Sequence, residues 1–504
     1  MADISGVVPK YLSPLVVLFG QAEALVPLVT WPRPATLDTA AKNAFVRVIR
    51  LQENPRRVDA MKRRLIILVA IAFLTLAGSR SASAQQRYIV RTTGGLTSVL
   101  NLCLSAGCQV QGPLDGSLGQ TYLVTSTGNL LQNLVGGLVN RLQALLGIQS
   151  IEPDQVLPMP LPPINNIPYG LRDTAPVSYY GTVVWHGYAA QPAAQIIRLT
   201  DAQNGFAVSG SGIVAVIDTG VDTTHPVLYP VLLPGYDFTR NQPGASEWLD
   251  VPQLQNGGTF KSEDQQPVIV QQSSAAILDQ SSAAILDGQP CAAFGHGTMT
   301  SGLVHLAAPS AKILPLKAFS SDGTGYLSNI VAALYYAVQH KANVVNMSFD
   351  LSTPSPALSQ AVSYANKASV VLVAAAGNEN TNARVYPAAM NGYVVGVAST
   401  TDWDARSSFS NYGSADVWLA APGEYVISTY PGGTYAAASG TSFSSPLVAG
   451  TAALLIEAKQ PLNQSQAASA LGHARRLTPD LNMGCLDAYQ AISAWLSSSS
   501  PWYW

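Results

Sequence analysis

The chain has 504 residues, of which 48% are apolar and 11% are charged, and its formal net charge is −2 at pH 7. This length allows two or three domains. The low content of charged residues excludes a disordered chain and a nucleic-acid-binding protein, and the small net charge indicates no strongly acidic or basic partner.

The first informative segment in chain order begins at Met61 and reads MKRRLIILVAIAFLTLAGSRSASAQQ. Three cations precede an apolar run at 65–77, and Ala-Ser-Ala at 82–84 gives a small-residue cleavage pattern, which is the order of a secretory signal peptide. The run is shorter than the roughly 20 residues of a membrane-spanning helix. We therefore expect a signal peptide at 61–84, export to the extracellular space or the periplasm, and no membrane attachment after cleavage.

Residues 1–60 precede this signal, although a signal peptide normally stands at the N-terminus. We interpret them as a mis-called N-terminal extension, with the true start at Met61. The alternative is an unusually long leader. In either case they are left out of the fold.

Residues 85–158 predict a small α+β domain, because strand-like and helix-like segments alternate there. The strands are RYIVRT (87–92), TYLVTS (121–126) and IQSIEPDQVLPM (148–159), and the helices are LTSVLNLCLSAG (96–107) and LLQNLVGGLVNRLQALLG (130–147). The proline-rich PMPLPPINNIPYG follows. Such a composition is extended and exposed, so we expect a linker and processing region at 159–190.

Residues 191–496 predict a second, larger domain built on a parallel sheet. IVAVI (213–217) is apolar throughout, as a strand buried on both faces must be, and four further segments repeat this signature: KILPLKAF (312–319), NVVNMSF (343–349), VVLVAAA (370–376) and YVVGVAS (393–399). Amphipathic helices between them, such as YLSNIVAALYYAVQHKA, cover the faces of such a sheet. We expect Lys317, within the second strand, to be exposed. Residues 497–504 form a low-complexity tail.

A tandem repeat, SSAAILDQ followed by SSAAILDG, occupies 273–288. Two copies are too few for a solenoid. We interpret the repeat as a duplication within a surface insertion at about 243–290, and its role stays open.

Four polar residues follow the predicted strands or open helix-like segments. In an open parallel sheet, ligands bind at the carboxyl ends of the strands. Asp218 directly follows IVAVI, and Asn378 lies just after VVLVAAA. The stretches FGHGTMTSG, with His296, and GTSFSSP, with Ser442, each begin a helix-like segment. The pattern therefore indicates a site made of an acid, a base, a hydroxyl and an amide.

Four motifs in this order, VAVIDTGVDTTHP, GHGTMTSGLV, AAAGNEN and GTSFSSPLVAG, resemble the catalytic segments of the subtilisin-like serine peptidases, the subtilase family. The resemblance covers about 195–495, and 87–158 resembles the inhibitory pro-domain of that family. It implies an α/β fold with a parallel sheet flanked by helices, preceded by a small α+β, ferredoxin-like pro-domain.

The resemblance also implies a role for each polar residue. A serine hydroxyl needs a neighbouring base to act as a nucleophile. His296 would serve as general base and acid, and Asp218 would hold its tautomer. Ser442 would attack the scissile carbonyl and form an acyl-enzyme, while Asn378 would donate to the oxyanion.

The family also implies where a peptide substrate binds. The segment 319–325 would pair with extended substrate backbone, and 348–353 with 374–377 would flank the pocket for the residue before the cut. Asp350 and its neighbours Phe349 and Leu351 stand where the family usually carries glycines, which puts its preference for large apolar residues in question. The implied substrate-binding residues are Ser321, Gly323, Gly325, Ser348, Ala375 and Gly377.

No metal-ligand spacing is present, and the chemistry requires no cofactor. The loop that binds calcium tightly in some relatives is absent, so a structural Ca²⁺ is possible elsewhere in the chain but is unsupported by the sequence. Export permits disulfides, and Cys103 with Cys108, and Cys291 with Cys485, are candidate pairs that the sequence leaves undecided.

The sequence as a whole predicts a secreted, self-processing serine endopeptidase that acts on polypeptides, is a monomer, and has its own pro-domain as an intramolecular inhibitor. The alternatives are a catalytically idle binding protein on the same scaffold and a peptide ligase or transpeptidase. The natural substrate, the residue preference at the cut and the pro-domain cleavage point between about Met159 and Val184 stay open.

Overall fold

The computed structural model describes residues 85–127, 130, 147–158, 169–251, 271–272 and 293–498. The expected extension at 1–60, the signal peptide at 61–84 and the tandem repeat lie outside these ranges. So do most of the helix expected at 130–147 and the tail from 499 onward. Within the described ranges, every helix is too short or too polar to cross a bilayer.

The first structured part is a four-stranded antiparallel sheet with the strand order β2-β3-β1-β4, and among its described residues helix α4 packs on this sheet. Its elements are β1 (Gln86–Thr92), α4 (Gly95–Ala106), β2 (Cys108–Pro113), β3 (Thr121–Ser126) and β4 (Ile148–Pro153). The first two expected strands and the first expected helix are therefore confirmed, whereas the third expected strand is divided into β4 and a short β5 (Val156–Pro158) that belongs to another sheet. Strand β2 was missed, because its polar residues alternate with few apolar ones.

A turn with a disulfide connects α4 to β2. Helix α4 ends at Gly107, whose left-handed φ of +72° suits a glycine. Cys103 and Cys108 on either side form a disulfide, which decides one of the two candidate pairs. Cys485 is a buried free thiol, so it does not form the second pair, and Cys291 lies outside the described residues.

The second part is built on an eight-stranded sheet with the order β10-β9-β12-β8-β14-β15-β16-β17. All its strand pairs are parallel except β9 with β10. The strands are β8 (Ile213–Asp218), β9 (Tyr236–Asp237), β10 (Gln242–Pro243), β12 (Lys312–Lys317), β14 (Val344–Met347), β15 (Val371–Ala375), β16 (Val395–Thr400) and β17 (Leu419–Pro422). The five apolar segments all form strands of this sheet, as expected.

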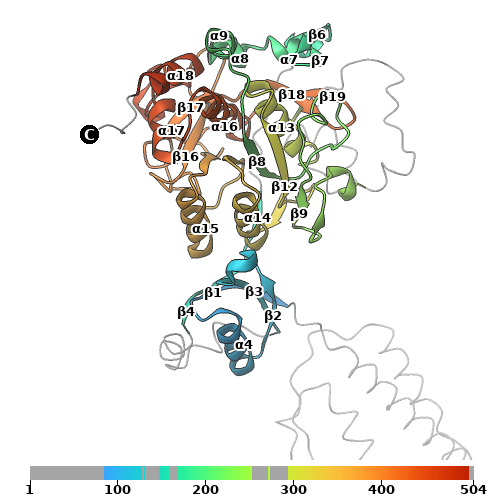
Figure 1. Cartoon of the computed structure of the whole chain (residues 1–504), viewed down its shortest axis with the longest axis vertical. Coiled ribbons are helices and arrows are strands. Elements are labelled where there is room, and N and C mark those ends of the chain that lie inside the picture. The colour runs from blue at the N-terminus through green and yellow to red at the C-terminus, as the bar shows by residue number, and fades with distance from the viewer. Residues whose placement is uncertain are drawn as a thin grey trace, which may run out of the picture. The chain divides into compact units, whose positions relative to one another are not determined.

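Helices cover both faces of the large sheet (Figure 1). Along β8, Val214 and Val216 pack into a core shared with α13 and α16, whereas Ala215 and Ile217 pack into a second core shared with α14 and α15. This alternation explains why the strand had to be apolar at every position. The main helices are α9 (Leu199–Phe206), α13 (His296–Ala307), α14 (Leu327–Gln339), α15 (Pro356–Lys367), α16 (Thr441–Ala458), α17 (Gln464–Leu471) and α18 (Ala488–Ser497).

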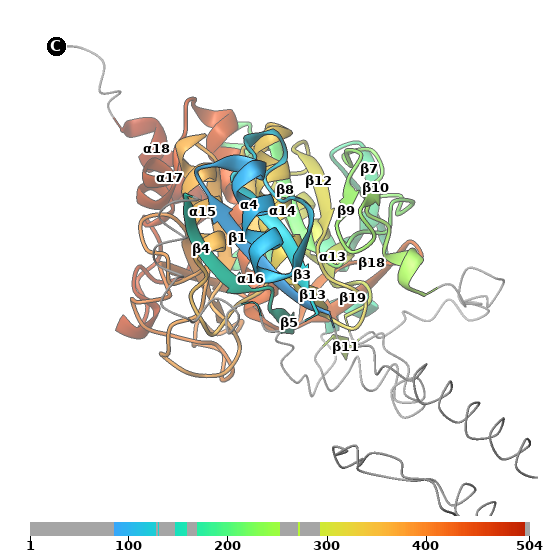
Figure 2. The same cartoon turned by 90° about the horizontal axis from the view of Figure 1, so that it is seen from below.

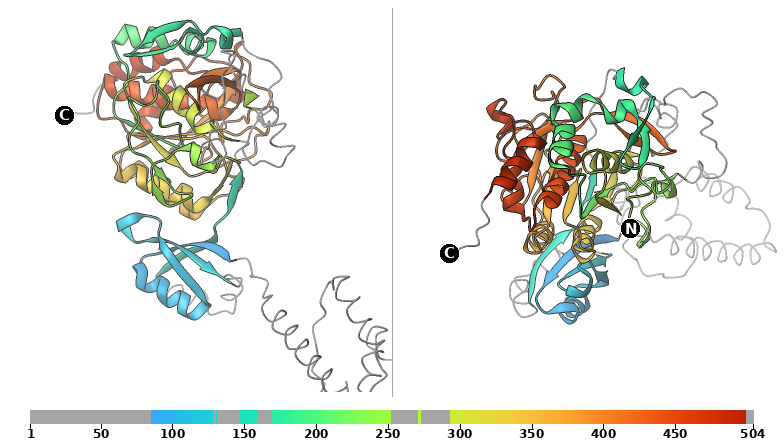
Figure 3. Two further views of the ribbon diagram at one scale, coloured as in Figure 1. Left: turned by 90° about the vertical axis from the view of Figure 1, so that its right-hand side faces the viewer. Right: turned by 45° about the horizontal axis from the view of Figure 1, so that its top comes forward.

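The chain between 169 and 190 is folded rather than an exposed linker. It contains a hairpin, and its Leu171, Val184 and Tyr188 are buried in the core of the large part. Figure 3 shows this green region beside the red C-terminal helices. The linker expected at 159–190 is therefore shorter. The elements here are β6 (Pro176–Tyr179), β7 (Thr182–Trp185), α7 (His186–Ala189) and α8 (Pro192–Ile196).

Two smaller sheets complete the architecture. In one, β18 (Val426–Tyr430) pairs antiparallel with β19 (Thr434–Ala438), and β11 (Gln271–Gln272) pairs parallel with β19. In the other, β5 (Val156–Pro158) pairs antiparallel with β13 (Thr324–Tyr326). This second pairing joins the end of the small part to an edge segment of the large part directly before α14, and Figure 2 shows β5 next to β13 from below.

Candidate active site

Asp218 and His296 form a buried hydrogen-bonded pair. Asp218 is the last residue of β8 and His296 the first of α13, and Nδ1 of the imidazole lies 2.8 Å from Oδ1 of the carboxylate. The carboxylate also accepts from the backbone N–H of Thr219 at 2.7 Å and from the hydroxyl of Thr300 at 3.1 Å. An aspartate held in this way fixes Nδ1 as the protonated nitrogen, which leaves Nε2 as the basic one. Nε2 is buried and has no hydrogen-bond partner among the described residues.

Ser442 lies in the first turn of α16, close to His296. The ring of the next residue, Phe443, is 5.2 Å from the imidazole between centroids. The Ser442 hydroxyl donates to the backbone oxygen of Ser348 at 3.2 Å and is shielded from solvent. In this structure the hydroxyl is therefore held by Ser348 and not by the imidazole.

A proline in α16 explains how Ser348 is tied to this turn. In a helix the N–H of residue 446 would bond to the carbonyl of residue 442, but Pro446 has no N–H. The Ser442 carbonyl instead accepts from the Ser348 hydroxyl at 2.9 Å. Asn346 donates to the same hydroxyl at 2.9 Å and accepts from Ser445 at 3.0 Å. The end of β14 and the start of α16 are thus joined by buried hydrogen bonds.

Asn378 is held next to Ser442 by the preceding residue of the helix. Its Oδ1 accepts from the backbone N–H of Thr441 at 2.9 Å and from the Thr441 hydroxyl at 3.0 Å. Gly377 donates its N–H to the same hydroxyl at 3.2 Å and has a φ of +94°. These bonds fix the side-chain amide so that its oxygen faces Thr441.

The residues expected to bind substrate fall into two groups. Ser348 and Gly377 lie beside Ser442 through the bonds just described, and Ala375 ends β15 in the buried sheet. Ser321, Gly323 and Gly325 belong to the turn and edge strand around β13, which is already paired with β5 of the small part. An edge strand of this kind accepts an extended peptide.

Sequence reasoning missed a buried carboxylate that joins the loops carrying Asp218 and His296. Glu247 opens a short 3-10 turn within the predicted insertion and is 1% exposed. Its carboxylate accepts from the hydroxyls of Thr219 and Thr298, and from the backbone N–H groups of Gly295 at 3.1 Å and Gly297 at 3.2 Å. These residues flank Asp218 and His296. Burial raises the pKa of Glu247 to about 7.

The expectation that Lys317 is exposed was wrong. Its ammonium is fully buried at the carboxyl end of β12 and donates to Asp250 at 2.7 Å, to the carbonyl of Thr219 at 2.6 Å and to that of Phe319 at 2.7 Å. The available signal was its place at the end of an otherwise apolar strand. A charge in that position must be paired to be buried.

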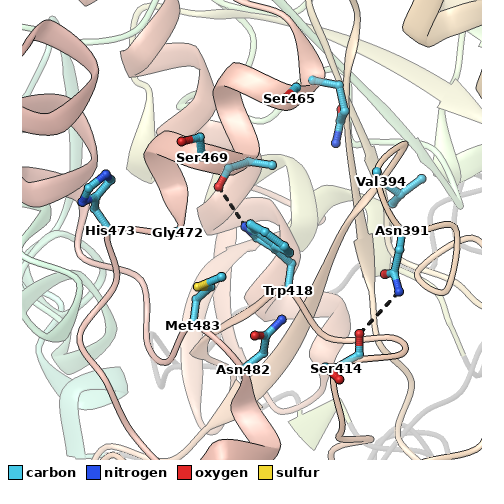
Figure 4. A pocket seen from close by; sticks show the side chains of 13 residues that line it. Asn391, Val394, Ser414, Trp418, Ser465, Ser469, Gly472, His473, Asn482 and Met483 are labelled. Carbon is cyan, nitrogen blue, oxygen red and sulfur yellow. Dashed lines mark hydrogen bonds between the residues drawn. The ribbon is translucent and has the colours of Figure 1, made fainter. Parts of the chain in front are cut away.

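A pocket of about 630 Å³ lies away from these residues, between α17 and the loops before β16 and β17 (Figure 4). The indole of Trp418 in it donates to the carbonyl of Ala468 at 2.8 Å. The described residues contain no group of three or more His, Cys, Asp or Glu side chains that could hold a metal ion, and the statement on calcium stays a prediction.

Comparison with known proteins agrees with the motifs. Residues 210–486 match the model of the subtilase family. A thermophilic serine proteinase of Bacillus sp. (strain AK1) is 37% identical over 260 residues, which are 50% of this chain and 55% of that protein. Thermitase of Thermoactinomyces vulgaris is 36% identical over 295 residues, which are 56% of this chain and 89% of thermitase. The chain thus spans about half the length of the first relative and most of the second.

Two solved structures are similar to the chain. A cold-adapted subtilisin-like serine proteinase is 28% identical with a TM-score of 0.44, over 56% of this chain and 90% of that protein. A lanthipeptide protease is 24% identical with a TM-score of 0.47, over 60% of this chain and 95% of that protein. On the family match and the likeness to thermitase, this chain belongs to the subtilase family of serine-type endopeptidases.

Proposed function

We propose that this chain is a secreted, self-processing serine endopeptidase that hydrolyses polypeptides through an acyl-enzyme on Ser442. The observation that carries the proposal is the buried Asp218–His296 hydrogen bond, which gives His296 a basic Nε2 beside the turn that holds Ser442. The hydroxyl turns from Ser348 to Nε2, gives up its proton and attacks the scissile carbonyl. His296 then returns the proton to the leaving amine, and water repeats the cycle to release the acid.

The developing negative charge on the carbonyl oxygen needs donors in fixed positions. We assign this role to the Nδ2 side of Asn378, since its Oδ1 is engaged by Thr441, and to the backbone N–H of Ser442. Both lie at the N-terminus of α16, where the helix dipole favours a negative charge. The proton transfers and the attack described above need no metal ion.

The small part at 85–158 is proposed to be an inhibitory pro-domain. Two of its acidic residues bind the N-termini of helices in the large part: Glu152 accepts from the N–H of Ala357 at 2.7 Å, and Asp154 accepts from the N–H and the hydroxyl of Ser328, both at 2.8 Å. Arg87 pairs with Asp154 at 2.7 Å. Carboxylates at these positions satisfy open N–H groups and suit the helix dipole.

The tail of this small part supports inhibition directly. After Asp154 the chain forms β5, which pairs with β13 at the edge that we assign to substrate backbone. The N–H of Leu327 also donates to the carbonyl of Gln155 at 2.9 Å. A substrate cannot add to β13 while β5 is bound there, so activity requires cleavage after Pro158 and release of the small part. The segment read as a signal peptide is the reason to propose export.

The test uses Ser442→Ala, with Ser444→Ala as the matched control. Ser444 is also a buried serine of the same helical turn, but it contacts neither His296 nor Ser348 among the bonds described. We expect the first variant to keep its precursor length and to leave casein intact, and the second to mature and cleave casein. Self-processing by Ser442→Ala, detected by mass spectrometry, would refute the assignment of the nucleophile.

The two alternatives make different predictions in the same assay. An idle binding protein leaves casein intact with the native sequence as well. A ligase or transpeptidase transfers the acyl group to an added amine in preference to water, which analysis of the products with an amine acceptor detects.

A further inference from the structure

A half-buried carboxyl, Asp350, lies beside the proposed acyl site, and one of its oxygens, Oδ2, is shielded from solvent with no cation paired to it among the described residues. Asp350 is two residues beyond Ser348, whose backbone and hydroxyl bond to Ser442. On the other side, a methyl group placed on Gly377 would lie 3.1 Å from Oδ2 of Asp350. Gly377 directly precedes Asn378. The carboxyl therefore reaches across to the segment that holds the proposed oxyanion donor.

The surroundings of Asp350 are acidic. Its Oδ2 is shielded from solvent and has no hydrogen-bond partner in the described part of the chain. Burial, then the charges of Glu379 and Asp416, raise the pKa of Asp350 to about 7. Oε2 of Glu379 accepts from Asn411 at 2.7 Å and would lie 2.7 Å from the same methyl group on Gly377. Arg384, which lowers the pKa of Asp416, is exposed.

A carboxyl oxygen shielded from solvent without a partner raises the free energy of the folded chain. The group must either bind a proton or keep its charge with neither water nor a cation to stabilise it. A cation brought into contact with it removes that cost, and the gain is large where water is excluded. The scissile carbonyl must lie between Ser442 and Asn378 if the proposed mechanism holds. The substrate residue that carries this carbonyl then lies between the segments on either side, Ser348–Asp350 and Gly377–Glu379, so its side chain can reach Asp350 and the more exposed Glu379.

We infer that Asp350, with Glu379 nearby, makes this peptidase select a lysine or arginine immediately before the scissile bond. The inference rests on the proposed function and deepens it by naming a substrate class. A large apolar side chain in the same position would bury the carboxyl further without pairing it. It is therefore disfavoured, although the pocket of an enzyme without this carboxyl would accept it.

The experiment compares four peptides that differ only in the residue before the cut, which is Lys, Arg, Leu or Phe. The matured enzyme is assayed at pH 8.5, where Asp350 is ionised. We expect kcat/KM for Lys or Arg to exceed that for Leu or Phe by about 30-fold or more, the size typical of a desolvated charge pair. Asp350→Asn should lower this ratio by a similar factor, mainly by losing the cationic substrates.

Asp201→Asn is the matched control, since it removes the same charge from the exposed side of α9. It should leave the ratio unchanged. Equal or faster cleavage after Leu and Phe by the native enzyme overturns the inference and leaves the proposed function standing. Failure to cut any of the four peptides, or casein, instead counts against the proposed function. The native ranking decides the question even if Asp350→Asn does not mature.

Discussion

Glu247 allows a direct test of how a buried side chain at the candidate site affects the stability of the fold. Its pKa is raised from 4.5 to about 7, chiefly by burial. An acid whose pKa is higher in the folded chain than in the unfolded chain binds more protons when folded. Its contribution to stability is therefore greatest at low pH and falls as the pH rises from about 4.5 to 7. Glutamine in the same place does not titrate.

The size of the effect follows from the shift. A difference of about 2.5 in pKa corresponds to about 3 kcal/mol in full. Between pH 5 and pH 8 about 2.5 kcal/mol of it should be lost, because part of the change lies below pH 5. The free energy of unfolding of the native sequence should thus fall by about 2.5 kcal/mol relative to Glu247→Gln over this range.

The assay is urea unfolding followed by circular dichroism at pH 5, 6, 7 and 8, with Ser442→Ala in both chains to prevent self-digestion. Glu457→Gln is the matched control. Glu457 also accepts two backbone N–H groups, from Ser209 at 2.7 Å and Gly210 at 2.5 Å, but it is exposed. The reasoning would be refuted if the difference in free energy of unfolding between the native chain and Glu247→Gln stayed constant within about 0.5 kcal/mol from pH 5 to 8.

Three further predictions follow from other contacts. Asn378→Ala should lower kcat by about 10²–10³ with little change in KM, the loss that removal of this type of donor causes in subtilisin itself, and steady-state kinetics on a peptide substrate measures it. Asp154→Asn breaks the ion pair with Arg87 and weakens the cap on α14 at Ser328, so activity after self-cleavage should appear about tenfold sooner in a casein time course; an unchanged delay contradicts the role of this contact. Arg172 is the one Lys or Arg between 159 and 184, and its side chain is exposed although the neighbouring Leu171 is buried, so the selectivity inferred for Asp350 predicts a slow trimming by a second molecule, after local opening of this folded turn, that leaves Asp173 as the N-terminus; Arg172→Gln should abolish that terminus in mass spectra.

The sequence predicted the elements whose burial is complete. A strand in the middle of a doubly covered sheet must be mainly apolar on both faces, and this composition predicted β8, β12, β14, β15 and β16. Strand β2 has one face exposed along its length, so its residues carry too little apolar character to separate it from a loop. The folded hairpin at 176–185 was missed for another reason, because the prolines that precede it suggested an extended linker.

The polar residues were harder to place, because their environment depends on chain segments far away. Asp218 and His296 could be named from their motifs. Glu247 and Lys317 could not be assigned, because charged residues are mostly exposed and a sequence alone does not show which of them are paired. Lys317 is buried only because Asp250 and two carbonyls surround its ammonium. These partners come from three different segments of the chain, at Thr219, Asp250 and Phe319.

The segment between Asp218 and His296 therefore has a structural role that the sequence did not indicate. Its excess length and repeat suggested a surface insertion at about 243–290. Yet its first residues contact the loops that carry Asp218 and His296, because Glu247 accepts from both of them and Asp250 pairs with Lys317. A carboxylate bonded on both sides resists separation of the loops, since moving either one leaves a buried donor without its acceptor. The distance between Asp218 and His296 is thus set partly by a segment outside the four motifs, and a motif search cannot detect this contribution.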